Sequence, residues 1–267
     1  MERSYSHAAG YDSTPSHVHF NYDASDKDRA IDTKRSSTAS VPVVTTNNLI
    51  LKSLPKNLFE AMRPSLRSVF VKKDQYLYMQ DDRLDYVYFP ETAVVSELRT
   101  LDDGRMVEVA ITGREGAAGL SSLVCSSRVA NCTQISQSGS IIRIESTVLN
   151  RLIRVYPELG QLLAPHLDQY IRQISQRAIC NMYHSVKERL CTWLLMVQDR
   201  SGRKTLKLTH EQIARTLGVY RPSVTCIALD LKKEELIDYS RGGITIRDRN
   251  QLEGSACHCY MELSAGV

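Results

Sequence analysis

The sequence predicts an α+β fold in which an antiparallel β-domain comes first, a long helical segment follows, and two short helices with a hairpin come last. Three observations predict this order. Short β-branched and aromatic runs alternate with turn residues between 69 and 144. An apolar stripe of helical period runs through 167–197. Helix-start, glycine-turn and helix signals, followed by two β-prone runs, fill 208–246.

The composition is that of a globular protein with one or two domains. The 267 residues are 42% apolar and 24% charged, which are ordinary values. No run approaches the roughly 18 apolar residues of a membrane span, and the N-terminus lacks the pattern of a signal peptide. Seven scattered cysteines favour free thiols in a reducing compartment. We therefore expect a cytoplasmic protein without a membrane segment.

Residues 1–47 are predicted to be a disordered N-terminal tail. Ser and Thr are frequent there, large aliphatic residues are few, and no periodicity persists. His7, His17 and His19 lie in this tail. Three histidines on a disordered segment do not by themselves predict a metal site.

Residues 48–150 form the predicted β-domain. It opens with one or two short helices from Leu49 to Ser65, broken by Pro55 and Pro64. Asp103-Gly104 indicates a hairpin, and other turn clusters separate the remaining runs. Many short strands at this spacing predict a closed or folded-over antiparallel barrel. The expected strands contain Val69-Phe70-Val71, Tyr76-Leu77-Tyr78, Tyr86-Val87-Tyr88-Phe89, Ala93-Val94-Val95, Met106-Val107-Glu108-Val109, Gln134-Ile135 and Ser140 to Ile144.

Residues 151–198 are predicted to be dimerisation helices and a linker. Pro157 can open a helix, whereas Pro165 would kink a helix that begins there. An apolar stripe between two compact domains needs a partner, and we expect a second copy of the chain by coiled-coil-like packing. The alternative is that the stripe packs only on its own β-domain. It continues through two helices that join near Tyr183-His184, and its members are Leu167, Ile171, Ile174, Ala178, Met182, Val186, Leu190, Trp193 and Val197.

Residues 199–250 are predicted to be a winged helix-turn-helix domain. Thr209 and Gln212 form a capping box that starts the first helix, and Gly218 ends it because glycine takes a positive φ without steric cost. Pro222 suits the first turn of a second helix, and a turn-rich segment then separates the two β-prone runs of a hairpin. The second helix is expected to place on one side Val224, Ile227, Ala228, Leu231 and Glu235.

Positive charge gathers in the same segment. Between 200 and 250, eleven Lys and Arg stand against six Asp and Glu, a local net charge of +5 compared with +4 for the whole chain. Basicity beside a helix that can enter a groove is the electrostatic signature of a DNA-binding protein. The alternative is a small helical domain with a solvated basic face. The cations are Arg200, Arg203, Lys204, Lys207, Arg215, Arg221, Lys232, Lys233, Arg241, Arg247 and Arg249.

Three segments carry a resemblance to a known family. They read Asp85-Tyr86-Val87-Tyr88-Phe89-Pro90, Gly113-Arg114-Glu115-Gly116, and Leu217-Gly218-Val219-Tyr220-Arg221-Pro222-Ser223-Val224-Thr225. Together with the order of the domains, they make the chain resemble the Crp/Fnr family of bacterial transcription regulators from about Leu49 to Tyr260. The resemblance implies a β-roll (a double-stranded β-helix) of the cyclic-nucleotide-binding type, a homodimer, and double-stranded palindromic DNA as a partner. It also implies a small-molecule or redox signal that the sequence does not identify, and RNA polymerase as a candidate partner.

The resemblance makes Tyr220 to Lys233 the recognition helix, whose N-terminal residues would face base edges in the major groove. Arg221 is the main candidate, because a guanidinium can pair bidentately with guanine O6 and N7. Cys226 stands where cyclic-AMP-binding members of the family carry a base-reading arginine, so we expect a different operator. The remaining DNA-binding candidates are Ser223 and Thr225 on this helix, Thr209 and Gln212 at the start of the first helix, and Arg241 on the wing.

The family's ligand loop departs from the cyclic-nucleotide pattern in this sequence. If the loops align from Gly113, Ala118 falls where the ribose-binding Glu belongs, and Val129 replaces the Ser that follows the phosphate-binding Arg. We therefore expect no cyclic nucleotide bound in the usual way. The ligand-pocket candidates that remain are Gly113, Glu115, Gly116, Gly119 and Arg128.

No cofactor or metal site is predicted. Oxygen-sensing members of the family hold an iron–sulfur cluster on N-terminal cysteines, and no cysteine precedes Cys125 here. Haem stays open, because one histidine can suffice. Cys125 and Cys132 are redox candidates with only Arg128 nearby to lower a thiol pKa. Cys257-His258-Cys259 lacks a second pair at zinc spacing and belongs to an expected C-terminal tail, 251–267.

Two other classes of function compete with DNA binding. One is a β-roll signalling module whose C-terminal domain binds protein rather than DNA, against which the clustered basic charge argues. The other is an enzyme, but the sequence holds no phosphate-binding loop, nucleophile elbow or catalytic His/Cys/Asp arrangement. We therefore expect a transcription regulator and not an enzyme.

Overall fold

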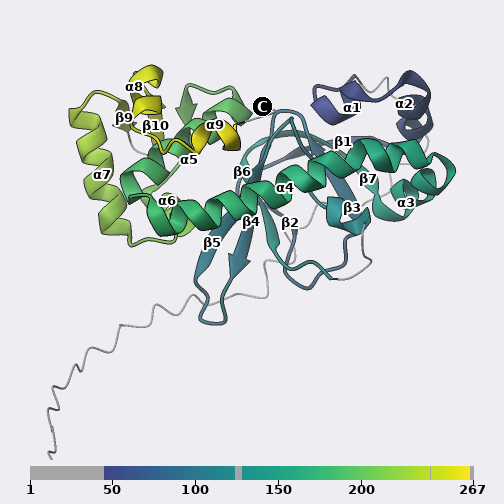
Figure 1. The fold of residues 1–267 in the computed structure, drawn as a ribbon, viewed down its shortest axis with the longest axis horizontal. Coiled ribbons are helices and arrows are strands. Elements are labelled where there is room, and N and C mark those ends of the chain that lie inside the picture. Colours follow the sequence, from purple (N-terminus) through teal and green to yellow (C-terminus); the bar gives the residue numbers. More distant parts are fainter. Residues whose placement is uncertain (1–44, 124–127, 241, 265–267) are drawn as a thin grey trace, which may run out of the picture.

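The computed structural model describes residues 45–123, 128–240 and 242–264. Most of the expected N-terminal tail lies outside these residues, as do Cys125 and Arg241. The described chain has a β-rich N-terminal part, a long helix α4, and a helical C-terminal part (Figure 1). This order confirms the predicted fold class.

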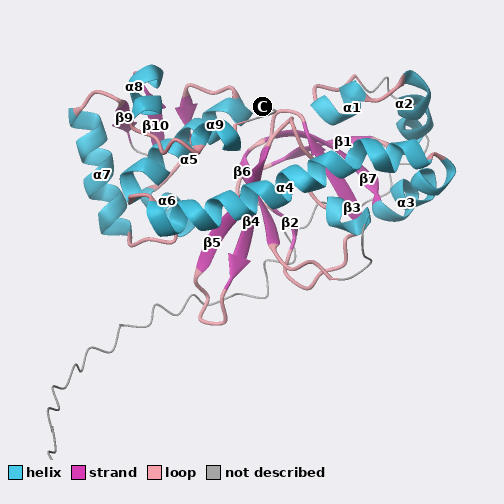
Figure 2. Cartoon of the chain, in the orientation of Figure 1, coloured by secondary structure: helices cyan, strands magenta, loops and turns pink. Residues whose placement is uncertain are grey.

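The strands of the N-terminal part form two antiparallel sheets that fold over one another. Their orders are β1-β7-β3 and β2-β6-β4-β5, and Figure 2 shows them as one block behind α4. Side chains from both sheets meet in a single apolar cluster, as the folded-over barrel requires. The strands are β1 (Arg67–Val71), β2 (Tyr76–Tyr78), β3 (Tyr86–Pro90), β4 (Val94–Thr100), β5 (Met106–Thr112), β6 (Cys132–Gln137) and β7 (Gly139–Glu145).

Short helices cover the outer face of the β1-β7-β3 sheet. Successive strand residues point to opposite faces, so Tyr88 and Ile141 join the interior cluster while Phe89 and Ile142 pack against the helices. Pro55 and Pro64 interrupt the helical run as expected. These elements are α1 (Leu49–Ser53), α2 (Lys56–Met62), η2 (Arg63–Ser65), η3 (Leu120–Leu123) and α3 (Ser146–Val155).

Two helices follow, α4 (Pro157–Tyr183) and α5 (Val186–Ser201). They meet at His184 and Ser185, so the predicted join near 183–184 is confirmed. Ser185 starts α5 with a capping box, in which its side chain accepts from the Glu188 N–H and Glu188 accepts in return. Pro165 lies within α4 without ending it.

The long apolar stripe does not face a single partner. On α5, Leu190, Trp193 and Val197 are buried in the core of the C-terminal part. On α4, Ile171 and Met182 keep 54% and 75% of their surface exposed. The expectation of one continuous dimer seam is therefore wrong for the α5 half, because the break at His184 turns that half toward its own domain.

The C-terminal part has the predicted helix-turn-helix and hairpin. Thr209 caps its first helix through the Gln212 N–H, and Gly218 ends that helix with φ 65°. Glu235, expected on the second helix, lies beyond its end with φ 59°. A third strand, which the sequence did not indicate, completes the sheet order β8-β10-β9. The elements are β8 (Thr205–Leu206), α6 (His210–Leu217), α7 (Arg221–Lys233), β9 (Ile237–Ser240) and β10 (Gly243–Ile246).

The expected C-terminal tail is folded as far as the structure describes it, to Ser264. Residues 249–254 form α8 (Arg249–Gly254), and α9 (Tyr260–Leu263) follows. Asp248 caps α8 by accepting from the Gln251 N–H. Leu252, Tyr260 and Leu263 are buried in the core shared with α5 and the helix-turn-helix. Helices this short carry no readable periodicity, and burial against α5 stabilises them.

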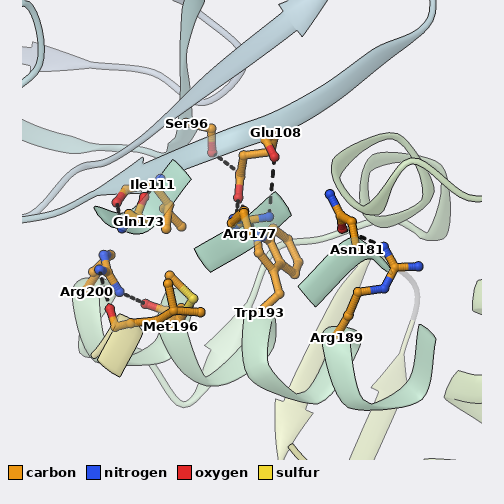
Figure 3. Close-up of polar contacts among 11 residues, drawn as sticks. Ser96, Glu108, Ile111, Gln173, Arg177, Asn181, Arg189, Trp193, Met196 and Arg200 are labelled. Atoms are coloured by element: carbon orange, nitrogen blue, oxygen red, sulfur yellow. Dashed lines mark hydrogen bonds and ion pairs between the residues drawn. The ribbon is translucent and has the colours of Figure 1, made fainter. Parts of the chain in front are cut away.

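The C-terminal part packs directly on the barrel. Glu108 of β5, almost fully buried, accepts from the Ser96 hydroxyl at 2.6 Å and from the Trp193 indole at 2.8 Å, and it pairs with Arg177 (Figure 3). The Gln173 amide accepts from the Ile111 N–H at 2.7 Å and donates to its carbonyl at 3.1 Å. Gln173 thus satisfies part of the open edge of β5, and these contacts fix α4 and α5 against the sheet.

Candidate nucleic-acid interface

The N-terminal half of α7 is a solvent-exposed polar surface. Arg221, Ser223 and Cys226 are all exposed, and Tyr220, the residue before the helix, keeps 83% of its surface. Pro222 lies in the first turn, where its missing N–H leaves no hydrogen bond unmade. Figure 1 shows α7 at the outer edge of the molecule, away from the barrel. The helix can therefore meet a large ligand without rearranging its own domain.

The Arg221 side chain makes no hydrogen bond to another described residue. In the described part of the chain it makes no ion pair, whereas Lys232 pairs with Asp238 at 3.2 Å and Lys233 with Asp230 at 3.6 Å. The five N–H donors of a guanidinium form a planar fork that fits a guanine edge or a phosphate. The exposed Arg221 guanidinium is therefore accessible to such a ligand.

Thr225 is engaged inside the domain instead. Its hydroxyl donates to the Arg221 carbonyl at 3.2 Å and lies 3.0 Å from His210 Nδ1. His210, at the start of α6, stacks on the Tyr239 ring with 4.4 Å between ring centroids. Burial, and then the charge of Arg221, lower the His210 pKa below its usual 6.5. Thr225 and His210 therefore hold α7 to α6 and to the wing, and in this conformation the Thr225 hydroxyl, a candidate DNA contact, is engaged within its own domain.

The start of α6 faces the barrel. The Gln212 side chain accepts from Lys73 Nζ at 2.8 Å and donates to Asp74 Oδ1 at 3.1 Å. Burial is the main cause that lowers the Lys73 pKa. Thr209, although exposed, uses its hydroxyl to cap α6. In this conformation the Gln212 side chain is hydrogen-bonded to residues of the barrel, so a DNA contact by Gln212 would require the domains to separate.

Part of the positive charge counted in the sequence is engaged in contacts within the chain. Arg200 is buried and pairs with Glu115 at 2.8 Å. Arg203 donates to the Ser138 carbonyl at 2.8 Å, and Arg249 pairs with Asp199 at 2.7 Å. The charge offered to a polyanion is therefore smaller than the sequence total indicates.

The residues predicted to line a ligand pocket do not converge on one. The Glu115 carboxylate turns toward Arg200 and accepts from the Gly113 N–H at 3.0 Å. Gly116 accepts from the Asn48 side chain through its carbonyl. Gly119 has φ 87°, and a Cβ there would come within 3.0 Å of the Tyr86 carbonyl. Arg128 is exposed and donates to the Asp81 carbonyl. These contacts within the chain give the loop a structural role.

The barrel interior beside that loop is filled. Ala118 pairs with Tyr88 through backbone hydrogen bonds in both directions and is buried. Val129 and Tyr78 pack in the same apolar cluster. Burial raises the Tyr88 pKa to about 12 and holds the Tyr78 pKa well above its ordinary value. Neutral, packed side chains thus occupy the region where a charged nucleotide would need polar partners.

Comparison with known proteins identifies the C-terminal domain and finds relatives of the whole chain. Residues 188–254 match the family model for the Crp-like helix-turn-helix domain. The chain is 22% identical over 212 residues to the global nitrogen regulator of Synechocystis sp., covering 76% of this chain and 94% of the relative. These matches support a transcription regulator of the Crp/Fnr type.

Solved structures of other bacterial proteins have the same fold. FixK2 from Bradyrhizobium japonicum superposes with a TM-score of 0.61 at 19% identity, covering 72% of this chain and 98% of FixK2. A putative Crp/Fnr regulator from Eubacterium rectale gives 0.63 at 19% identity, covering 77% and 96%. At this identity the match establishes the fold alone.

Sequence reasoning missed several residues of this protein. His210 was not singled out, because no local sequence pattern indicates its stacking on Tyr239. Glu108 lay within an apolar strand, and its burial against Trp193 arises from a contact 85 positions away. In the described part of the chain no helix is long and apolar enough to cross a membrane.

Proposed function

We propose that this Crp/Fnr protein is a transcription regulator that binds a palindromic DNA site as a homodimer, with α7 in the major groove. The observation that carries the proposal is the exposed N-terminal half of α7, on a Crp-like helix-turn-helix domain, with an Arg221 that makes no ion pair to a described residue. A recognition helix in such domains reads bases with its N-terminal residues.

Base reading falls to Arg221, Ser223 and Cys226, whose side chains are exposed. Arg221 would pair with a guanine, and the smaller side chains would select bases by hydrogen bonding and by fit. Thr225 acts indirectly, by fixing α7 through His210. Arg241 remains the wing candidate for a phosphate contact.

The dimer would form along the outer face of α4. The opposite side of this helix contacts the barrel through Gln173 and Arg177. The outer face carries apolar and small side chains at successive spacings of 7, 4, 3 and 4, which follow the seam of a coiled coil. A second copy of the chain carries the same seam, so the two copies can pack symmetrically along it. A two-fold symmetric dimer in turn fits a palindromic DNA site. The residues are Ala164, Ile171, Ser175, Ala178 and Met182.

Binding to genomic fragments tests the proposal. Gel shifts should select fragments that share a palindrome, and log Kd should rise steeply with log salt concentration, because Lys and Arg displace counterions from phosphates. The competing function is a signalling module whose C-terminal domain binds protein. Capture of a protein partner without any DNA selected above random fragments would favour that module. RNA polymerase is the partner expected of a promoter-bound regulator, and recruitment at a selected fragment would identify it.

Cyclic AMP should not bind the barrel. Ala118 and Val129 remove two polar partners, and the interior cluster fills the space beside them. Calorimetry with cyclic AMP should give no heat beyond dilution, and a micromolar complex would contradict this reading.

A further inference from the structure

Three cysteines and a histidine lie together where α4 ends. Cys180 is in the last turn of α4 and His184 is its C-cap, while Cys257 and Cys259 lie in the turn between α8 and α9. One ligand atom from each lies within 4.8 Å of all the others. We propose that these four residues bind one Zn²⁺ ion.

The distances fit a single metal ion. Zinc bonds thiolate sulfur at about 2.3 Å in a tetrahedron, which places two ligand sulfurs about 3.8 Å apart. Cys180 Sγ and Cys257 Sγ are 4.0 Å apart. A disulfide would need about 2.05 Å, and an iron–sulfur cluster would hold its cysteines farther apart because iron and sulfide lie between them. Three thiolates and one imidazole are a common ligand set for structural zinc.

The local fold presents the ligands toward one another. Residues four apart lie on one helix face, so Cys180 and His184 project together from the end of α4. His184 Nδ1 is buried and has no hydrogen-bond partner among the described residues. A buried ring nitrogen without a partner costs free energy unless a ligand occupies it.

Polar groups around the cysteines are placed to donate to thiolates. Gln176 Nε2 donates to Cys259 Sγ at 2.8 Å and lies 3.9 Å from Cys180 Sγ. The Thr192 hydroxyl accepts from the Cys257 N–H at 3.0 Å, so its own proton is free for Cys257 Sγ, also at 3.0 Å. Donors to the ligand atoms are typical of metal centres, because they orient the ligands and stabilise their charge.

A nearby cation would balance the charge of the proposed zinc complex. Three thiolates and a neutral imidazole around Zn²⁺ leave a net charge of −1. Arg189 interacts electrostatically with Cys180 and Cys257, is held by Asn181 at 2.7 Å (Figure 3), and has a buried Nε without a partner in the described chain. A cavity of about 20 Å³ adjoins the same two cysteines. A fixed cation and unfilled space favour an anionic metal complex here.

The ion would join segments that are distant in sequence. Cys180 and Cys257 are 77 positions apart, and the ion would tie the joint between α4 and α5 to the C-terminal helices. The angle at that joint places the helix-turn-helix relative to the outer face of α4. Zinc would therefore stabilise the arrangement of the DNA-binding domain, and this inference stands whether or not the proposed DNA function is correct.

Metal analysis of the full chain tests the proposal. The protein should be produced with added zinc, without a polyhistidine tag, and passed through a weak chelator before elemental analysis. We expect one zinc per chain. Cobalt in place of zinc should give thiolate-to-cobalt charge-transfer bands and the d–d bands of a tetrahedral ion. The N-terminal histidines cannot produce the thiolate bands.

Matched variants locate the ion. Cys257→Ala and Cys259→Ala should lose the metal and the cobalt bands. Cys191→Ala removes a thiol that is equally buried in the same core but lies outside the group, and it should keep one zinc. A strong chelator should lower the Tm of wild type and of Cys191→Ala, and zinc should restore it, whereas the Cys257→Ala Tm should not respond. This comparison separates metal loss from a general loss of folding.

Three results would overturn the proposal. They are wild-type protein with only traces of zinc and no thiolate–cobalt bands, full zinc content in the Cys257→Ala/Cys259→Ala double variant, and a Cys180–Cys257 disulfide in freshly isolated protein. Stoichiometric iron or copper instead of zinc would also contradict it.

Discussion

At the scale of single residues, the first turn of α7 places a free guanidinium beside a buried imidazole. Arg221 has no ion pair in the described chain, while His210 is packed between Thr225 and Tyr239. The two side chains have different roles. Arg221 is available to a ligand, and His210 holds together the helices that position Arg221. Substitutions at these positions should therefore separate recognition from stability.

Replacing Arg221 by Ala should cost about 1–3 kcal/mol of operator binding if it pairs with a guanine. The loss should fall on one base pair in each half-site, which binding selection with randomised sites would detect. Arg241→Ala is the comparison: it should weaken all sequences alike and reduce the salt slope by about one unit. If Arg221→Ala weakens specific and random DNA by the same factor, Arg221 is a phosphate contact and not a base reader.

Stability should fall in acid partly through His210. The Thr225 hydroxyl donates to the Arg221 carbonyl, so it accepts from His210 Nδ1–H, and Nε2 is buried without a partner in the described chain. Protonation would add an N–H there with no acceptor. Because the folded pKa lies below 6.5, the unfolded chain binds the proton more readily; the contribution is full above 6.5 and is lost as pH falls through the folded pKa.

Urea unfolding of wild type and His210→Asn between pH 5 and pH 8 measures this contribution. The variant should show a shallower loss of stability below pH 6.5. Burial lowers the pKa of His166 as well, so the difference between the two proteins, and not the wild-type slope, reports His210. Parallel curves would exclude His210 as a contributor.

At the scale of elements, α4 has two faces with opposite chemistry. Its inner face makes polar contacts with β5, and its outer face exposes Ile171 and Met182. Exposed apolar side chains on a regular seam are typical of an interaction surface. The dimer proposal depends on this face alone.

Ile171→Asp should abolish the dimer. Burial of an unpaired carboxylate in an apolar seam costs on the order of several kcal/mol, while in the monomer the position is exposed and tolerates charge. Light scattering should show a monomer that binds a full palindrome weakly. Val155→Asp, the same kind of substitution at an exposed apolar residue of α3, should leave the dimer intact. A dimeric Ile171→Asp protein would place the interface elsewhere.

The elements readable from the sequence are those with local causes. The capping box at Thr209, the turn at Gly218 and the strand runs depend on neighbours a few positions away, and the structure has them. The two-residue strand β8 and the helices α8 and α9 depend on packing against distant segments, so no local sequence pattern indicates them. The same difference applies to the candidate site. Arg221 could be identified from its local sequence, whereas the hydrogen bonds of Gln212 to Lys73 and Asp74 join residues 138 or more positions apart.

At the scale of the whole molecule, Glu108 couples the barrel to the C-terminal part. Its carboxylate is buried between Arg177 of α4 and Trp193 of α5. Removing one partner of a buried ion pair leaves an uncompensated charge and costs about 3–5 kcal/mol. Glu108→Ala should therefore lower the Tm and separate the unfolding of the two parts.

Calorimetry would show this as two transitions in place of one. Glu108→Gln, which keeps an acceptor for Trp193 and a partner for Ser96, should be milder. Asp103→Ala, which removes an exposed carboxylate of the β4–β5 hairpin paired with Arg105, should keep a Tm close to wild type. A single transition at the wild-type temperature in Glu108→Ala would mean that other contacts couple the domains.

The buried C-terminal helices determine where the chain can be cut. A fragment that ends at 250, after the wing, would remove most of α8 and all of α9 and uncover the face of α5 on which Tyr260 and Leu263 lie. Such a fragment would expose apolar surface and aggregate. The smallest C-terminal fragment that keeps this core intact therefore reaches at least Leu263 and begins no later than Ser185, the cap of α5.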